Sequence, residues 1–253
     1  MQKISATIIT FNEEKKIAAC LASLQGVADE IIVMDSFSTD NTVAICKQFG
    51  AKVYQQPWSG YGQQKNDAAA KATFDYILSI DADECLSTTL QHSINKLKET
   101  GFTGVYKINR LNIFYGYTLN FGLTQPDRII RIYDRKLIKW SLRLVHETLE
   151  LPEKIKINEI KGNLIHTSKD SMQDFITTIN KYSTLSAISY FERGKKVSIF
   201  KILVNPAFTF FKGYFINLGF LDGIPGLIMA FTLSLETFLK YSKLYFLIKA
   251  KNY

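Results

Sequence analysis

Apolar runs alternate with helical patterns over the first hundred residues of the chain. The apolar runs "ISATIIT", "EIIVMDS", "AKVYQQ" and "DYILSID" are rich in β-branched residues, which is typical of strands buried on both faces. Between them, "EEKKIAACLASLQ", "STDNTVAICKQFG" and "GYGQQKNDAAAKAT" have helical spacing. Acids open the first helix, Asp40 or Ser38 is the expected N-cap of the second, and Gly50 its expected end. This order of elements predicts right-handed crossovers and a doubly wound α/β sheet.

The alternation stops near residue 101. The stretches "GVYKINRLNIF", "RIIRIYD" and "KINEIKGNLIH" have the composition of extended segments, and from about residue 171 the chain has mainly helical patterns. No internal repeat or low-complexity linker separates these parts. We therefore expect one α/β domain, formed by residues 1–100 and 101–170, followed by a helical C-terminal appendage at 171–253.

The C-terminal appendage is apolar and aromatic from Val197 to Leu247, but charges interrupt it. Its longest uncharged run, Gly223 to Leu235, has 13 residues and contains Pro225. A membrane-spanning helix needs roughly 20 apolar residues. The pattern therefore favours helices that lie in the bilayer interface, with lysines toward lipid phosphates. Ordinary core helices packed against the sheet are the alternative.

Charge is unevenly distributed along the chain, whose formal net charge is +8. From Arg193 onward, nine basic residues face only Asp222 and Glu236. Such a basic region needs an acidic partner, either nucleic acid or an anionic membrane surface. Because long aliphatic runs separate the basic residues, the sequence favours the membrane and argues against nucleic acid.

Cysteine usage and the N-terminus indicate the compartment. The three cysteines are scattered, odd in number and without metal-ligand spacing, which is typical of a reduced cytosolic protein. The first apolar run is too short for the core of a signal peptide and leads directly into acids. We therefore expect the mature protein to begin here, in the cytoplasm.

Acidic residues follow three of the predicted strands. Thr10 to Glu13 follow the first, Asp35 the second, and Asp81 and Asp83 the fourth. Helix capping is an alternative role for such residues, but ligands of open α/β sheets bind beyond the carboxyl ends of the strands. Alternate residues of an extended segment face one side, so Asp81 and Asp83 can point into one site. Acids this close need a positive charge among them, and carboxylates suit Mg²⁺ or Mn²⁺ shared with a diphosphate.

Gly-rich phosphate loops are absent after the first strand. Neither G-x-G-x-x-G nor G-K-[ST] occurs there. This argues against a dinucleotide-dependent dehydrogenase and against a P-loop NTPase.

The motifs "ATIITFNEEKKIAACLASL", "EIIVMDSFSTDNT", "GYGQQKNDA" and "ILSIDADE" resemble, in order and spacing, the family 2 glycosyltransferases of GT-A fold. Further stretches, "RLNIFYG", "RIIRIYDRK", "LVHE" and the segment that starts at "LDGIPG", are similar to the branch of lipopolysaccharide-core β-glucosyltransferases. The resemblance covers nearly the whole chain. It implies a GT-A fold, a Rossmann-like mixed sheet in which residues 1–100 bind a nucleotide sugar and 101–170 form the acceptor side.

The resemblance also implies roles for individual residues. Contacts to the nucleotide sugar fall on Thr10, Phe11, Glu13, Asp35, Lys65 and Asp81. Asp83 is the expected metal ligand, joined by His166 or by His146, which could instead orient Glu147. A structural, hydrogen-bonded role is the alternative for each histidine. Glu147 in "VHE" is the expected general base.

A leaving diphosphate gains negative charge, which a metal and nearby cations stabilise. Arg128 and Arg131 are candidates for this role, and Arg110 is another; surface arginines on strands are the alternative for each.

The resemblance implies an inverting, metal-dependent transfer of a hexose, with glucose expected, from a UDP-sugar to a lipid-anchored or lipopolysaccharide-core glycan. This chemistry would take place peripherally at the cytoplasmic face of the inner membrane, with Mg²⁺ or Mn²⁺ as cofactor. A polyprenyl-phosphate acceptor is one alternative, and a non-catalytic, membrane-attached nucleotide-sugar-binding protein is another.

Overall fold

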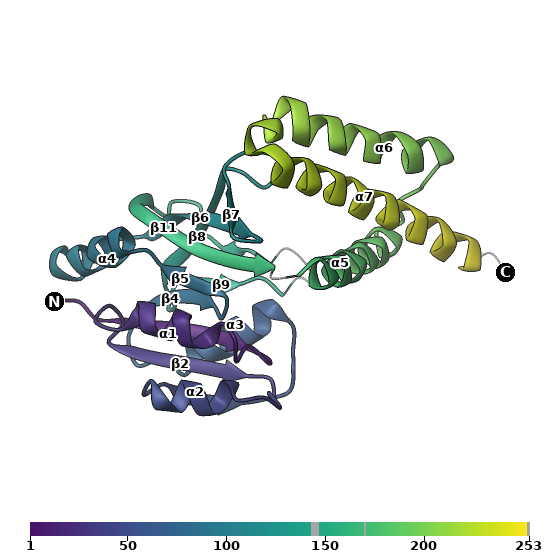
Figure 1. The fold of residues 1–253 in the computed structure, drawn as a ribbon. Helices are drawn as coiled ribbons and strands as arrows, with labels where there is room; N and C mark the ends of the chain where they lie inside the picture. Colours follow the sequence, from purple (N-terminus) through teal and green to yellow (C-terminus); the bar gives the residue numbers. More distant parts are fainter. Residues whose placement is uncertain (143–146, 170, 252–253) are drawn as a thin grey trace. The chain divides into compact units, whose positions relative to one another are not determined.

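The computed structural model describes residues 1–142, 147–169 and 171–251 (Figure 1). The chain forms two compact units. The first consists of Met1–Leu111 with Asp127–His166, and the second of Asn112–Pro126 with Thr167–Tyr253. The expected α/β segments 1–100 and 101–170 thus lie mostly in the first unit. The expected helical region 171–253 lies in the second, together with the short segment 112–126.

A mixed sheet with the strand order β3-β2-β1-β4-β8-β6-β11-β5 organises the first unit, and β7 pairs with the end of β6. The first four strands along the chain pair in parallel, and β8, β6 and β5 are held by antiparallel pairs. Strands β9 and β10 form a separate two-stranded sheet. The bounds are β1 Ile4–Thr10, β2 Glu30–Asp35, β3 Lys52–Gln55, β4 Tyr76–Asp81, β5 Glu84–Leu86, β6 Val105–Phe114, β7 Tyr117–Leu119, β8 Asp127–Asp134, β9 Lys139–Trp140, β10 Leu149–Glu150 and β11 Ile157–Lys169.

Four helices cover the two faces of this sheet. Buried side chains of α1, α2 and α4 share one core with the residues of β1 and β4 that point to the same face, such as Ile8 and Ile80. Residues of α3 pack on the other face, where Ala68 meets Ile9 and Met34. The helices are α1 Ile17–Leu24, α2 Thr42–Gln48, α3 Tyr61–Ala70 and α4 Thr88–Thr100. The predicted order of strands and helices is therefore confirmed, and the antiparallel half comes from β5 and the segments beyond residue 101.

Helix α1 begins later than predicted. Its first residue is Ile17, so the expected acids of the first turn lie outside it. The backbone N–H of Glu13 instead donates to Thr42 Oγ1 at 2.8 Å, and Glu14 Oε2 accepts from the backbone N–H of Asn41 at 3.1 Å. Glu13 and Glu14 lie outside the helix because the start of α2 supplies their hydrogen-bond partners. At α2 itself the N-cap is Asn41, and Asp40 accepts from the N–H of Thr42 at 3.0 Å.

Strand register brings the polar strand ends to one edge of the sheet. Thr10 lies opposite Asp35, and Ile9 lies opposite Asp81. The antiparallel pairing of β11 with β5 places His166 opposite Glu84. This edge is where an open α/β sheet binds its ligands.

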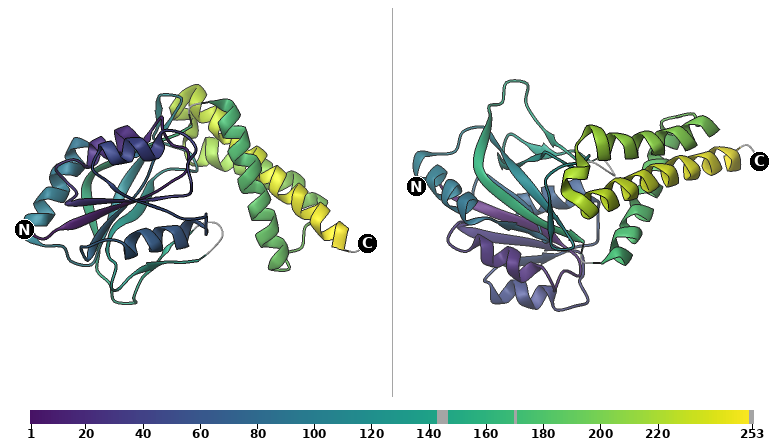
Figure 2. Two further views of the ribbon diagram at one scale, coloured as in Figure 1. Left: turned by 90° about the horizontal axis from the view of Figure 1, so that it is seen from below. Right: turned by 45° about the horizontal axis from the view of Figure 1, so that its top comes forward.

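The second unit is mainly helical, as predicted. Helix α7 packs against both α5 and α6, and α6 and α7 run side by side in every view (Figures 1 and 2). The core of this unit joins Phe114 and Leu119 to Phe175 and Ile179. Its elements are α5 Met172–Glu192, α6 Ile199–Phe211, the π-helix η1 Lys212–Ile216, the 3₁₀ helix η2 Gly219–Asp222 and α7 Gly223–Lys251.

Candidate active site

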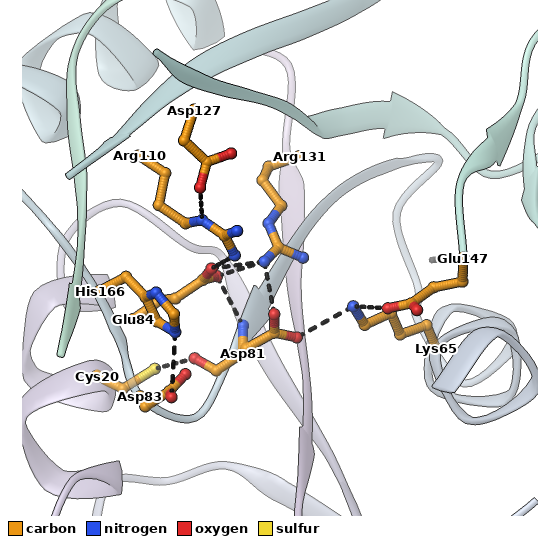
Figure 3. Close-up of polar contacts among 10 residues, drawn as sticks. All are labelled: Cys20, Lys65, Asp81, Asp83, Glu84, Arg110, Asp127, Arg131, Glu147 and His166. Atoms are coloured by element: carbon orange, nitrogen blue, oxygen red, sulfur yellow. Dashed lines mark hydrogen bonds and ion pairs between the residues drawn. The ribbon is translucent and has the colours of Figure 1, made fainter. Parts of the chain in front are cut away.

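A cluster of paired charges lies at the carboxyl end of β4 (Figure 3). Asp81, the last residue of β4, accepts from Arg131 Nη2 at 2.6 Å. Its other carboxylate oxygen lies 3.2 Å from Lys65 Nζ, and the same ammonium lies 3.1 Å from Glu147 Oε1. Two side chains of the protein therefore supply positive charge at Asp81, where the sequence led us to expect a divalent cation. Lys65 also joins the expected base to the acid of β4.

The pairing fixes the ionisation of the cluster. Burial alone would raise the pKa of Asp81, but Arg131 and Lys65 outweigh burial and hold that pKa well below its usual range. Burial would likewise lower the pKa of Arg131, yet Asp81 and Glu84 raise it. Both groups are therefore charged at neutral pH, and Asp81 acts as a hydrogen-bond acceptor.

Glu84 is a member of the cluster to which the sequence analysis gave no role. Its side chain is fully buried. It accepts from Arg131 Nη2 at 2.6 and 2.8 Å, from Arg110 Nη1 at 3.2 Å, and from the backbone N–H of Asp81 at 3.0 Å. Arg110 donates in addition to Asp127 at 2.7 Å. The acidic residue directly after "DAD" was the only sequence signal for Glu84. Its partners Arg110 and Arg131 could not be predicted, because they lie on strands much later in the sequence.

The two arginines predicted on β8 have different environments. The β6–β8 pairing shifts from Tyr106↔Ile132 to Lys107↔Ile130, so Arg131 occupies a bulge, a feature that re-aims side chains. Arg131 is 3% exposed, whereas Arg128 is exposed and pairs with Glu159 at 2.7 Å. The structure thus brings Arg131, and not Arg128, to the cluster. Arg131 positions Asp81 there through Nη2, which also donates to Glu84.

Asp83 and His166, the two residues for which a metal-binding role was predicted, face each other. His166 Nε2 lies 3.3 Å from Asp83 Oδ2, and their side chains are 18% and 23% exposed (Figure 3). A carboxylate and an imidazole are suitable donors for Mn²⁺, and a substrate diphosphate commonly completes such a site. Among the described residues no third His, Cys, Asp or Glu joins the pair to complete a protein-only site. The second predicted histidine, His146, lies outside the described residues.

The predicted nucleotide contacts after β1 and β2 share the same sheet edge. Thr10 is buried, and Phe11 is 55% exposed. The buried carboxylate of Asp35 accepts from the backbone N–H of Ser38 and from Gln55 Nε2, both at 2.9 Å, and from the Ser38 hydroxyl. Asp35 therefore shapes the loop after β2. Nucleotide contacts by these residues and by Glu13 stay a prediction.

Helix α3 holds Lys65 in place. The Lys65 ammonium lies 4.5 Å from the ring centre of Trp140, and the side chain of Asn66 exchanges two hydrogen bonds of 2.9 Å with the backbone of Trp140. Gly62 lets α3 approach this segment closely, because a Cβ there would lie 2.0 Å from the carbonyl oxygen of Ser141. The motif "QQKN" identified Lys65 as a candidate site residue, but no sequence pattern identified Trp140 as its neighbour.

We expect Arg131→Met to lower the free energy of unfolding by about 3 kcal/mol, because it leaves buried Asp81 and Glu84 without their main counter-charge. Chemical denaturation at pH 7 measures the loss. The double variant Arg131→Met/Glu84→Gln removes one uncompensated charge and should recover part of it. Arg128→Met, whose partner is exposed, should change stability by less than about 1 kcal/mol. Equal losses in the two single variants would contradict the burial argument.

Comparisons with known proteins define the family. The family model "Glycosyl transferase family 2" matches residues 5–159, which include the sheet edge with Asp81, Asp83 and Glu147. The chain belongs to this family and is a glycosyltransferase.

Curated relatives extend the match over the chain's full length. An uncharacterized glycosyltransferase of Rickettsia felis is 34% identical and covers 100% of this chain and 93% of its own length. The lipopolysaccharide core biosynthesis glycosyltransferase LpsC of Rhizobium meliloti is 32% identical over 96% of this chain and 92% of its own. The predicted similarity to the lipopolysaccharide-core branch is therefore confirmed.

Solved structures share the fold. TarS 1–349 of S. aureus in complex with UDP-GlcNAc aligns with a TM-score of 0.50 at 18% identity, covering 93% of this chain and 81% of that one. Glucosyl-3-phosphoglycerate synthase from Mycobacterium tuberculosis in complex with Mn²⁺, UDP and phosphoglyceric acid aligns with a TM-score of 0.50 at 18% identity, covering 78% and 80%. These likenesses confirm the predicted GT-A fold of the sheet unit.

Proposed function

We propose that this glycosyltransferase moves a hexose, glucose first among the candidates, from a UDP-sugar to a saccharide of the lipopolysaccharide-core type. The observation that carries the proposal is the joining of Asp81 and Glu147 through Lys65 beside the Asp83–His166 pair. The acceptor class comes from LpsC, a core-biosynthesis enzyme that is similar over 96% of this chain. The donor class comes from structural relatives solved with UDP-GlcNAc or UDP.

Asp83 and His166 fit a divalent cation in this proposal, because both present a ligand atom at the sheet edge and both are partly accessible. A structural relative was crystallised with Mn²⁺ and UDP. When bound, such a cation neutralises negative charge that develops on the departing diphosphate.

Glu147 takes the proton of the attacking acceptor hydroxyl in the proposed reaction. Its side chain is 18% exposed, and Lys65 contacts Oε1 at 3.1 Å, so Oε2 is the atom we assign to the proton. The hydroxyl oxygen forms a bond to the anomeric carbon while the bond from that carbon to the diphosphate oxygen breaks. One displacement inverts the anomeric centre, so an α-linked donor gives a β-linked product.

Lys65 has a positioning role in this scheme. Lys65 is 4% exposed, and its ammonium bridges two carboxylates. Because α3 fixes Lys65 through Trp140 and Gly62, the orientation of Glu147 depends on the packing of α3. The base is therefore held at a set place relative to Asp81, and an aligned base is what a displacement at carbon requires.

A donor panel tests the proposed function. We expect UDP-glucose with Mn²⁺ to raise the melting temperature of the protein more than GDP-mannose does, since a ligand that binds only the folded state stabilises it. Transfer to a truncated core oligosaccharide should then release UDP and give a β linkage, which the anomeric NMR coupling reports. An α product would overturn the inverting mechanism. Transfer to polyprenyl phosphate but to no oligosaccharide would overturn the acceptor, and donor binding without any turnover would overturn the enzymatic proposal.

A further inference from the structure

Most of the large exposed apolar side chains among the described residues lie on one helical hairpin, residues 199–251, formed by α6, η1, η2 and α7. We call this segment the apolar hairpin. On α6 and η1 they recur every three to four residues, which places them on one helical face. This face carries Phe200, Val204, Phe208, Phe211 and Phe215, of which Phe200 is 67% exposed.

Helix α7 continues the same pattern. Its exposed apolar residues also follow helical spacing and are Ile224, Leu227, Phe231, Leu235, Phe238, Tyr245 and Phe246. The residues between the two helices are used for packing: Ser234 Oγ donates to the carbonyl of Pro206 at 2.8 Å, and Ile202 is buried. The exposed faces therefore remain after the unit has completed its own core.

The charges of this region are complementary to an anionic surface. Exposed basic residues precede and interrupt the apolar faces: Arg193, Lys195, Lys196, Lys201, Lys212 and Lys249. The two acids in this region are Asp222 and Glu236. Asp222 is engaged, since it accepts from the backbone N–H groups of Asn120 at 3.0 Å and Phe121 at 2.9 Å. Apolar faces bordered by lysines fit a lipid interface with anionic headgroups.

We infer that the apolar hairpin binds the interface of an anionic phospholipid bilayer, with the aromatic faces of α6 and α7 among the acyl chains and the lysines at the phosphates. This agrees with the sequence-based expectation and assigns it to particular faces. The inference does not depend on the donor or the acceptor proposed above.

Two segments of the hairpin, Ile199–Ile216 and Gly219–Ala250, are long and apolar enough to cross a membrane by length and composition. The contacts of Asp222 oppose a crossing. Asp222 lies at the turn of the hairpin and is bonded to the segment 112–126, which connects strands β6 and β8. Roughly 15 extended residues reach ~50 Å, whereas crossing the ~30 Å hydrocarbon core in both directions needs ~60 Å. The turn therefore stays on the same side of the bilayer as the two ends of the segment 112–126.

The opposite end of the hairpin is held by hydrogen bonds to α5. Lys243 Nζ donates to the carbonyl of Asn180 at 2.8 Å and to Ser183 Oγ at 2.8 Å, which fixes α7 to α5. If this end crossed the bilayer, α5 would have to enter it with Asp174 and Lys181, and α5 is not among the segments with the composition of a membrane span. A hairpin lying along the interface meets both constraints.

Vesicle co-sedimentation tests the inference with the purified full chain. We expect the protein to pellet with phosphatidylcholine vesicles that contain 30% phosphatidylglycerol, and several-fold less with phosphatidylcholine alone or at high salt. Phe200→Ser/Leu203→Ser, at side chains 67% and 62% exposed, should lower the partition coefficient at least about tenfold. Leu137→Ser, at a side chain 62% exposed in the sheet unit, is the matched control and should bind like the wild type.

Charge reversal and extraction separate the remaining explanations. Lys195→Glu/Lys196→Glu/Lys201→Glu should lose most binding to the anionic vesicles. The control Lys47→Glu/Lys139→Glu/Lys154→Glu, at lysines that are also exposed but lie in the sheet unit, should keep it. Alkaline carbonate should release the protein from cell membranes. Retention after carbonate would overturn interfacial binding in favour of a span. A wild-type protein that ignores vesicles and forms a dimer disrupted by Phe200→Ser/Leu203→Ser would show that a second copy covers this surface.

Discussion

A Glu147→Gln variant is expected to keep donor affinity and to lose sugar transfer by a factor on the order of 10³. The amide has nearly the shape of the carboxylate but cannot accept the proton of the acceptor hydroxyl. Lys65 still has Asp81 as a counter-charge at 3.2 Å, so the fold should survive. The measurement is single-turnover transfer from UDP-glucose to a core oligosaccharide, with donor affinity from the thermal shift in the same buffer.

Two readouts distinguish a base from a structural residue. Slow hydrolysis of the donor in the absence of acceptor should persist in Glu147→Gln. Water is present at high concentration and can attack the anomeric carbon without being positioned by the base. Glu150→Gln, an exposed acid of the neighbouring strand β10, is the matched control and should transfer at the wild-type rate. Unchanged transfer by Glu147→Gln would remove Glu147 from the role of base.

The second large effect is expected at Asp83. Asp83→Asn should weaken Mn²⁺ binding in the presence of UDP by at least about 30-fold, because one anionic oxygen ligand becomes a neutral amide. Electron paramagnetic resonance of free Mn²⁺ measures this directly and does not depend on turnover. The metal-dependent release of UDP should fall in parallel, by a factor on the order of 10² or more.

His166→Ala should weaken Mn²⁺ binding as well, because Nε2 faces Asp83 at 3.3 Å. The matched control is Asp75→Asn, since Asp75 has a side chain that is about half exposed, precedes the same strand β4 and pairs with Lys136. If Asp83→Asn bound Mn²⁺ and UDP as tightly as the wild type, the cation would have to lie elsewhere, and the Asp83–His166 contact would be only structural.

The sheet could be predicted from the sequence because its first half is local. The parallel strands β1, β2 and β4 are largely apolar runs, and each ends in a polar residue, so Asp35 and Asp81 could be assigned to one edge before any coordinates. The partners of those acids could not be assigned. Lys65 meets Glu147 across a separation of 82 residues, and Glu84 meets Arg131 across 47. The first contact depends on the residues that lead into β10 of the separate two-stranded sheet, and the second on the antiparallel half of the main sheet; neither arrangement leaves a periodic signal in the sequence.

Arg128 and Arg131 show most clearly what could not be predicted from the sequence. Both stand on one predicted strand three residues apart, and strand alternation alone puts them on opposite faces without saying which face meets Asp81. The bulge at Arg131 also shifts the pairing register between β6 and β8, and nothing in the sequence "RIIRIYD" predicts this shift. In the helical region, by contrast, the spacing of apolar residues on α6 and α7 can be read from the sequence. The structure adds which helical faces pack and which stay exposed.

The insertion 112–126 has a practical consequence for anyone who wishes to shorten this enzyme. Phe114 and Leu119 belong to the same core as Phe175 and Ile179, although strands of the catalytic sheet flank them on both sides along the chain. Truncation after residue 166 would remove the helices that pack on the segment 112–126. Phe114 and Leu119 would then be exposed to water, which favours aggregation. A variant with less exposed apolar surface is better designed by replacing exposed apolar side chains of residues 199–251 with polar ones while every helix is retained.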